Sequence, residues 1–264
     1  MYGRYHLIKK YLRYYLHASN GKGHGVHSPF VFDFIKNVIN DRYDYDAYGK
    51  IESRRKALLQ DTSFIRVEDF GAGPVINQKE NRQVSKIAAR SLKPKKYAQL
   101  LYRMIKYYKP LQVIELGTSL GITTAYLASG TNASVHTLEG SPTIAAIAEK
   151  TFVSLGIKNI IQHIGNFDDT FPPLLSNIRP PLFVFVDGNH RREPTLRYFQ
   201  EVLKYADFST IIVFDDIHWS TEMEEAWDLI KKNSLVTLSI DLFFIGIVFF
   251  KSDFKVKQHF SVRF

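Results

Sequence analysis

From Leu111 onward, short apolar runs alternate with amphipathic stretches, and this alternation restricts the possible folds more than any other feature. The apolar runs are typical of buried strands and lie at 111–116, 134–138, 160–164, 182–187, 210–215, 235–240 and 243–250. Helical patterns fill most of the gaps, near 121–129, 141–155, 193–205 and 219–232. Strands that alternate with helices form a parallel sheet covered by helices on both faces.

The last two apolar runs have no room for a crossover helix, because only Asp241 and Leu242 separate them. They must therefore pair antiparallel. We expect an α/β fold: a doubly wound, mostly parallel seven-stranded sheet closed by an antiparallel C-terminal hairpin, with a mainly helical N-terminal extension. The run 242–250 is far shorter than the ~20 residues of a membrane span, and no signal peptide is recognisable. We expect a cytoplasmic protein with no membrane partner.

Charge divides the chain unevenly. Residues 1–110 contain 22 Lys and Arg against 9 Asp and Glu, whereas residues 111–264 contain 13 against 17. We expect a basic, aromatic-rich helical extension or cap over 1–96 and the α/β domain over 97–264. The basic helix predicted over Tyr2–Leu16 is a solvated face, an RNA contact or an oligomer interface. The absence of cysteine excludes disulfides, thiolate zinc sites and a cysteine nucleophile.

A glycine turn follows the first strand of the α/β region. Gly117 and Gly121 let the backbone pass close to a ligand at the carboxyl end of the strand, where doubly wound sheets bind ligands. A plain tight turn would use the same glycines. Ser119 stands where a dinucleotide fingerprint has its second glycine, which argues against a dinucleotide. Glu115 would face a ligand with ammonium or hydroxyl donors.

Two further motifs lie at the ends of the next two strands. Glu139 follows Gly117 by 22 residues, the spacing of an acid that accepts both hydroxyls of an adenosine ribose; the alternative is a surface carboxylate. After the third strand, Phe167 would flank an adenine ring and Asp168 would accept a hydrogen bond from its amino group. Asp168 or Asp169 would equally well cap a short helix.

Together, Glu-Leu-Gly-Thr-Ser-Leu-Gly at 115–121, Glu139, Gly-Asn-Phe-Asp at 165–168 and the closing hairpin resemble the class I S-adenosylmethionine-dependent methyltransferases. The similarity is closest to small-molecule O-methyltransferases of the catechol type and covers about residues 91–250. It implies that 97–264 is an S-adenosylmethionine-binding methyltransferase domain.

The resemblance also implies roles for individual residues. The methionine end of the cofactor would be lined by Gly117, Thr118, Ser119 and Thr123, with the Thr123 hydroxyl on the carboxylate. Glu139 would hold the ribose, and the adenine side would be formed by Asn166, Phe167 and Asp168. The remaining cofactor contacts would come from Glu115, Gly121 and Asp187, and the segment 91–96 would close over the cofactor.

Three carboxylates converge at the ends of the fourth and fifth strands: Asp187, Asp215 and Asp216. Like charges this close would repel, and Mg²⁺ or another divalent cation bound by oxygen would relieve the repulsion. The catechol-type enzymes have Asp, Asp and Asn at these positions, so the third residue departs from their pattern. The alternative is that one acid contacts the cofactor, another caps a helix and no metal binds.

His190 and His218 lie beside these acids, and each is a candidate general base or a structural histidine. Without a metal, one of the two would deprotonate the substrate; with a metal, the metal would lower the pKa of a bound hydroxyl. Two N-terminal segments, 25–30 and 69–73, are expected to reach the active site as lids, or to be ordinary turns.

The sequence thus predicts in-line transfer of a methyl group from S-adenosylmethionine to an oxygen of a small molecule. An RNA methyltransferase that uses the basic extension is the first alternative, although no Asn-Pro-Pro-Tyr signature is present. The others are an NAD-dependent oxidoreductase, which Ser119 and the hairpin disfavour, and a cofactor-binding protein without catalysis. A homodimer through the N-terminal extension is expected as a further partner.

Overall fold

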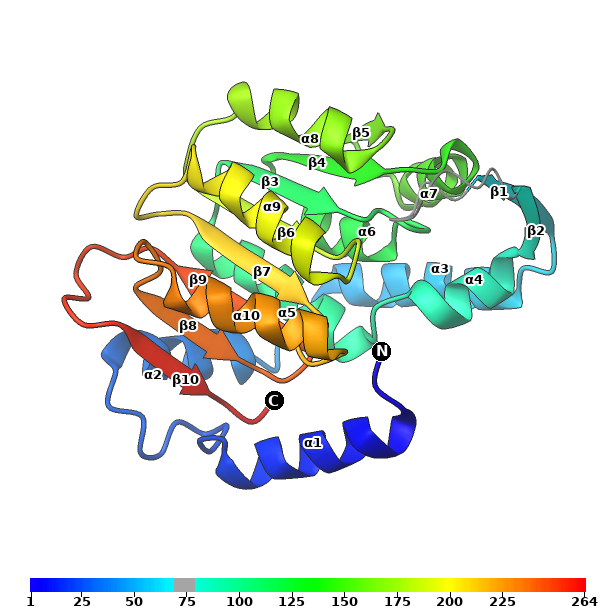
Figure 1. Ribbon diagram of the computed structural model, residues 1–264. Coiled ribbons are helices and arrows are strands. Elements are labelled where there is room, and N and C mark those ends of the chain that lie inside the picture. The colour runs from blue at the N-terminus through cyan, green and yellow to red at the C-terminus, as the bar shows by residue number, and fades with distance from the viewer. Residues whose placement is uncertain (69–78) are drawn as a thin grey trace. The chain divides into compact units, whose positions relative to one another are not determined.

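The computed structural model describes residues 1–68 and 79–264 (Figure 1). By compactness these residues form two units: the first comprises Met1–Arg42 and Arg179–Phe264, and the second comprises Tyr43–Ile178. No helix in the described residues combines the length and the apolar character that crossing a membrane requires. The predicted lid segment at 69–73 lies outside the described residues.

Eight strands form the main, mostly parallel sheet, and three of them lie in the second unit in the order β3-β4-β5. These are β3 (Gln112–Leu116), β4 (Ser134–Glu139) and β5 (Ile160–Ile164), all parallel. The connecting helices are α6 (Ile122–Ser129) and α7 (Pro142–Leu155), and α8 (Phe167–Ser176) follows β5. The carboxyl ends of β3, β4 and β5 therefore share one edge.

The second unit also contains the helical part that precedes β3. Its elements are α3 (Asp46–Gln60), the antiparallel pair β1 (Phe64–Glu68) and β2 (Lys79–Gln83), α4 (Val84–Ser91) and α5 (Lys95–Tyr108). In Figure 1, α3 and α4 run side by side, and α7 lies next to β1. A buried cluster that includes Tyr48, Leu58, Ala98 and Tyr126 packs α3, α4 and α5 against α6.

The first unit contains the other five strands of the main sheet, in the order β10-β8-β9-β7-β6. They are β6 (Leu182–Val186), β7 (Ile211–Asp215), β8 (Leu238–Asp241), β9 (Ile245–Phe249) and β10 (Gln258–Ser261). The helices are α1 (Arg4–His17), α2 (Pro29–Phe34) with its π-helical continuation Ile35–Ile39, α9 (Arg192–Leu203) and α10 (Thr221–Lys232). Every residue of β6 to β9 is buried.

The predicted fold class is confirmed, including the closing hairpin: β9 pairs antiparallel with both β7 and β8. The predicted strand number of seven is wrong, because β10 adds an eighth strand parallel to β8. Its sequence, Gln-His-Phe-Ser, lacks an apolar run. The predicted domain boundary at residue 96 stays a prediction. The two compact units are a different division, with boundaries after residues 42 and 178.

Candidate cofactor-binding and catalytic sites

The glycine turn after β3 is held against the end of β4 by backbone hydrogen bonds. The amides of Gly117 and Thr118 donate to the carbonyl of Leu138 at 3.0 and 3.1 Å. Gly121 has φ +83° and precedes α6; a Cβ at this position would lie 2.6 Å from the Phe152 ring. Both the backbone conformation and the close approach of Phe152 therefore require glycine at 121.

Ser119 links this turn to two other elements of the second unit. Its backbone has φ +48°, a left-handed conformation that non-glycine residues rarely adopt. Its amide donates to Oε2 of Glu139 at 2.9 Å, and its hydroxyl lies 2.7 Å from that of Ser91. The first residue of the predicted closing segment 91–96 therefore contacts the turn itself.

Glu139 ends β4 and is oriented by two backbone amides. Besides the bond from Ser119, its Oε1 accepts a hydrogen bond from the amide of Ser141 at 3.0 Å. Its backbone carbonyl accepts the amide of Gly165 at 2.9 Å, which brings the end of β5 to the same edge. A half-buried carboxylate fixed at the carboxyl end of the second strand has the placement expected of a ribose acceptor.

The residues predicted to form the adenine side lie at the end of β5 and the start of α8. Gly165 has φ +143°, and Asn166 is the N-cap of α8, where its side-chain oxygen accepts the amide of Asp168 at 3.1 Å. The idea that Asp168 or Asp169 caps this helix is therefore wrong, because both lie in its first turn. Phe167 is half-buried and Asp168 is exposed.

Glu115 is fully buried near the end of β3 and is only partly hydrogen-bonded. Its Oε2 accepts hydrogen bonds from the hydroxyls of Thr124 and, at 2.7 Å, of Thr137. Its Oε1 is buried and accepts no hydrogen bond from any described residue. Burial raises the pKa of Glu115 to about 7, helped by the charge of Glu139; the two hydroxyls, and to a smaller extent Lys93, act in the opposite direction. Such a carboxylate suits a cationic ligand group.

In the first unit, Asp187 follows β6, and Asp215 is the last residue of β7. They form a three-residue set with His190, whose ligand atoms all lie within 4.8 Å of one another. His190 Nε2 lies 3.6 Å from Asp187 Oδ1. Two carboxylates and an imidazole are side chains that bind many divalent cations as ligands. Among the described residues this is the one such set, and it contains His190 where the sequence predicted Asp216.

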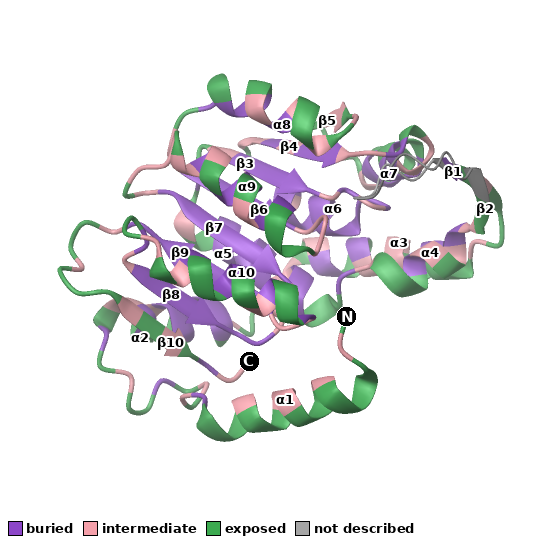
Figure 2. Ribbon diagram, in the orientation of Figure 1, coloured by how far each residue is buried: buried purple, intermediate pink, exposed green. Residues whose placement is uncertain are grey.

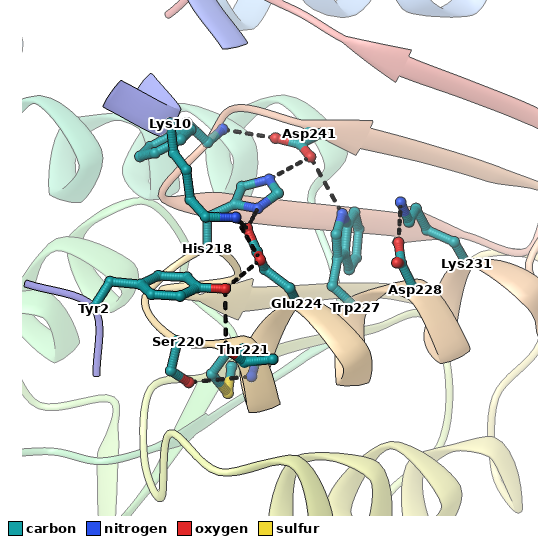
Figure 3. Close-up of polar contacts among 12 residues, drawn as sticks. Tyr2, Lys10, His218, Ser220, Thr221, Glu224, Trp227, Asp228, Lys231 and Asp241 are labelled. Atoms are coloured by element: carbon teal, nitrogen blue, oxygen red, sulfur yellow. Dashed lines mark hydrogen bonds and ion pairs between the residues drawn. The ribbon is translucent and has the colours of Figure 1, made fainter. Parts of the chain in front are cut away.

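His218 makes a different kind of contact, shown in Figure 3. Its Nδ1 lies 3.0 Å from Glu224 Oε1, and its Nε2 lies 2.8 Å from Asp241 Oδ2. Since both partners are carboxylates, both ring nitrogens act as donors and the ring is an imidazolium. Burial lowers the pKa of His218, but the hydrogen bonds and charges of Asp241 and Glu224 outweigh it, and the pKa is raised. This geometry suits a structural cation better than a general base.

The N-terminal segment completes this group, which we call the His218 cluster: Tyr2, Lys10, His218, Glu224 and Asp241. Lys10 Nζ lies 2.8 Å from Glu224 Oε2, and the Tyr2 hydroxyl donates to the same oxygen at 2.7 Å. The cluster thus pairs two cations with two carboxylates. Sequence reasoning missed Tyr2 and Lys10, because residues more than 200 positions from Glu224 give no spacing signal. It also missed Glu224 and Asp241, 6 and 23 positions from His218, because they belong to no motif that it recognised.

Comparison with known proteins supports the interpretation of these motifs. Residues 114–217 match the family model described as a methyltransferase domain. The match identifies a methyltransferase domain within the chain. It includes the glycine turn, Glu139 and the set of Asp187, His190 and Asp215. A search of the curated proteins gave no match.

Several solved structures share the fold. The O-methyltransferase from Bacillus cereus, in complex with SAH, is 18% identical with a TM-score of 0.55, over 80% of this chain and 93% of that chain. The SAH-bound methyltransferase from Podospora anserina is 14% identical with a TM-score of 0.58, over 85% and 97%. The O-methyltransferase TomG from Streptomyces achromogenes, involved in tomaymycin synthesis and in complex with SAM, is 15% identical with a TM-score of 0.55, over 80% and 92%.

Proposed function

We propose that this protein transfers a methyl group from S-adenosylmethionine to an oxygen atom of a small molecule. The observation that carries the proposal is Glu139, a carboxylate oriented by the amides of Ser119 and Ser141 next to the glycine turn of a methyltransferase domain. The structures of similar fold contain SAH or SAM, and two of those named above are O-methyltransferases, which supports both the cofactor and the atom that is methylated.

We assign cofactor binding to the second unit. Glu139 accepts the ribose hydroxyls, Gly117 to Ser119 and Thr123 line the methionine end, and Asn166 to Asp168 flank the adenine. The residues fit this cofactor, because the buried Oε1 of Glu115 has no partner among the described residues and a methionine ammonium would supply one. When bound, S-adenosylmethionine supplies a methyl group on a positively charged sulfur.

We assign acceptor activation to Asp187, His190 and Asp215 of the first unit. These residues would hold the acceptor oxygen. S-adenosylmethionine would supply its methyl group to that oxygen, and the electron pair of the carbon–sulfur bond would stay on the sulfur. The acceptor hydroxyl gives its proton to the imidazole of His190, and Asp187, whose Oδ1 lies 3.6 Å from Nε2, stabilises the imidazolium that forms. We prefer His190 to His218 as the base, because both nitrogens of His218 already face carboxylates.

The same three side chains would hold a divalent cation. Removing metal ions with a chelator distinguishes activation of the acceptor by a metal from activation by His190 as a base. If a metal activates the acceptor, dialysis against EDTA abolishes turnover and Mg²⁺ restores it. If His190 is the base, EDTA has no effect, and H190A loses about 10²–10⁴-fold in kcat. H218A serves as the comparison for both.

Cofactor binding is tested by titrating the purified protein with S-adenosylmethionine in a calorimeter. E139A should lose roughly tenfold or more in affinity, because a ribose loses its charged acceptor. E149A, which removes an exposed acid from α7 of the same unit, is the control. Equal affinities of E139A and wild type would overturn the assignment.

Stabilisation by NAD in a thermal-shift assay would favour an oxidoreductase. If none of a set of phenols and other hydroxyl compounds is methylated when SAH is formed, O-methylation of such compounds is ruled out.

A further inference from the structure

Helix α1 presents an apolar face that nothing in the described structure covers. We call it the outer arc: Tyr5, Ile8, Leu12 and Leu16, which are 83, 50, 57 and 74% exposed. The spacing of three and four residues places these side chains on one side of the helix. Figure 2 shows α1 in exposed and intermediate colours along its length, and none of its residues is buried.

The opposite side of α1 is fastened to the first unit. Lys10 pairs with Glu224 of α10, and the Tyr14 hydroxyl donates to the carbonyl of Val262. The Tyr11 ring meets Phe243 edge-on, with 5.1 Å between centroids. Because the first unit already packs against this inner side of α1, it does not also cover the outer arc.

The charges beside the outer arc have one sign. Lys9 and Arg13 are exposed and lie along one side of it on the helix surface. The helix contains no Asp or Glu, and the first acidic residue of the chain is Asp33. An apolar face whose neighbouring charges are all cationic complements a surface that is apolar below and anionic above.

We propose that α1 lies in the plane of an anionic lipid surface, with the outer arc inserted among the acyl chains and Lys9 and Arg13 at the lipid phosphates. Helices with this pattern bind at the interface through buried apolar area together with attraction to anionic headgroups. Tyrosine, here at position 5, suits the boundary between headgroup and acyl chain. This proposal departs from the expectation of no membrane partner. That expectation was argued from the length of a membrane span, and a helix in the interface plane needs no such length.

Two other occupants fit the surface less well. A second copy of the chain would place Lys9 and Arg13 near the same cations of its partner, with no acid on either helix to pair with them. A nucleic acid would use the cations, but it would leave the aliphatic side chains of Ile8, Leu12 and Leu16 without apolar contact.

The test is co-sedimentation of the full chain with vesicles of phosphatidylcholine containing phosphatidylglycerol, and with vesicles of phosphatidylcholine alone. We expect binding to the anionic vesicles that weakens as salt is raised. I8S/L12S should weaken binding about tenfold or more, since two inserted side chains are lost. K9Q/R13Q should weaken it severalfold on anionic vesicles only.

Matched controls remove similar groups elsewhere. L111S/L235S replaces two leucines that are 61 and 54% exposed, and K86Q/R90Q removes two exposed cations from α4. Both controls should bind vesicles like wild type, and circular dichroism should show that all variants remain folded. Absence of vesicle binding, or binding that I8S/L12S leaves unchanged, would overturn the proposal. So would a dimer in sedimentation velocity that I8S/L12S dissociates, or RNA binding that K9Q/R13Q removes while vesicle binding is absent.

Discussion

The two compact units each bury acidic side chains, but they balance the charge in different ways. In the first unit, the carboxylate oxygens of Glu224 and Asp241 lie 2.8–3.0 Å from the side-chain nitrogens of His218 and Lys10 in the His218 cluster. In the second unit, Glu115 is fully buried with two hydroxyl partners and one oxygen that accepts no hydrogen bond from the described residues. Both arrangements lie near the carboxyl ends of strands, where this fold binds ligands.

The difference separates structure from function. A buried carboxylate with cationic partners is satisfied within its own unit and serves to fasten α1 to α10 and β8. A buried carboxylate without such a partner costs stability, and this cost is recovered when a cationic ligand binds. From sequence position alone, His218 and Glu115 are equally good candidates for functional residues. Only their hydrogen-bond partners in the structure distinguish them.

The largest effect is expected from breaking the His218 cluster at Asp241. D241A removes the acceptor of His218 Nε2 at 2.8 Å, of Trp227 Nε1 at 3.3 Å and of the Phe243 amide at 2.8 Å. We expect a loss of about 3 kcal/mol in the free energy of unfolding, because a buried imidazolium loses one of its two counter-charges. Urea unfolding measures it. D253A, which removes an exposed acid of the same unit, should stay within about 0.5 kcal/mol of wild type; equal losses would contradict the comparison.

Glu115 should make stability depend on pH in the opposite sense to an ordinary salt-bridged acid. Its folded pKa, about 7, lies above the ordinary 4.5, so the unfolded chain loses this proton first as the pH rises. Stability therefore falls between about pH 4.5 and about pH 7. From pH 5 to pH 8, wild type should lose up to about 3 kcal/mol more than E115Q, at about 1.4 kcal/mol per pKa unit. Unfolding curves at both pH values measure this.

The control for that experiment is E193Q, which changes an exposed glutamate of α9. Its pH dependence should follow wild type. If E115Q also follows wild type, Glu115 has its ordinary pKa and the contrast between the units fails.

A smaller effect should follow from removing one of the hydroxyl donors to Glu115. T124V leaves the buried carboxylate with a single donor and should cost about 1–2 kcal/mol, more at pH 8 than at pH 5, since the charged form needs the bond most. T195V is the matched control, because Thr195 is also buried but, among the described residues, its hydroxyl meets only the Met223 sulfur at 3.5 Å. A pH-independent cost in T124V would indicate lost packing instead.

The smallest effect is expected at the exposed edge of the His218 cluster. Lys10 is about one third exposed, so its pairing with Glu224 is screened by solvent, and K10Q should cost about 0.5–1 kcal/mol. Its neighbour Lys9 lies on the exposed side of α1, and K9Q should leave the unfolding free energy unchanged. Thermal unfolding of the two variants side by side gives the comparison, and equal midpoints would show that Lys10 adds nothing.

Local patterns predicted most of the fold and part of the site. The apolar runs located β3 to β9, and the two-residue gap after residue 240 indicated the hairpin, because these features depend on neighbouring residues. Strands β2 and β10 gave little signal, since their side chains are largely polar and their pairing is decided by the strands they meet. The positions of the glycine turn after β3 and of Glu139 at the end of β4 could be predicted because their spacing reflects a short strand–turn–helix unit. The partners of Glu115 and His218 lie 6 to 23 positions away on other elements, and which of them face each other is decided by the packing of those elements.

The first unit is assembled from the two ends of the chain, and this has a consequence for synthesis. The hydrogen bond from Tyr2 to Glu224 joins residues 222 positions apart, and Ser19 bridges to Val262. At ~5–20 residues per second, roughly 10–40 s separate the emergence of Lys10 from that of Glu224. During that interval α1 has left the ribosome with both of its faces bare, while the whole second unit has been completed. A truncation before Glu224 would leave α1 permanently in this state and make the nascent chain a target for chaperones.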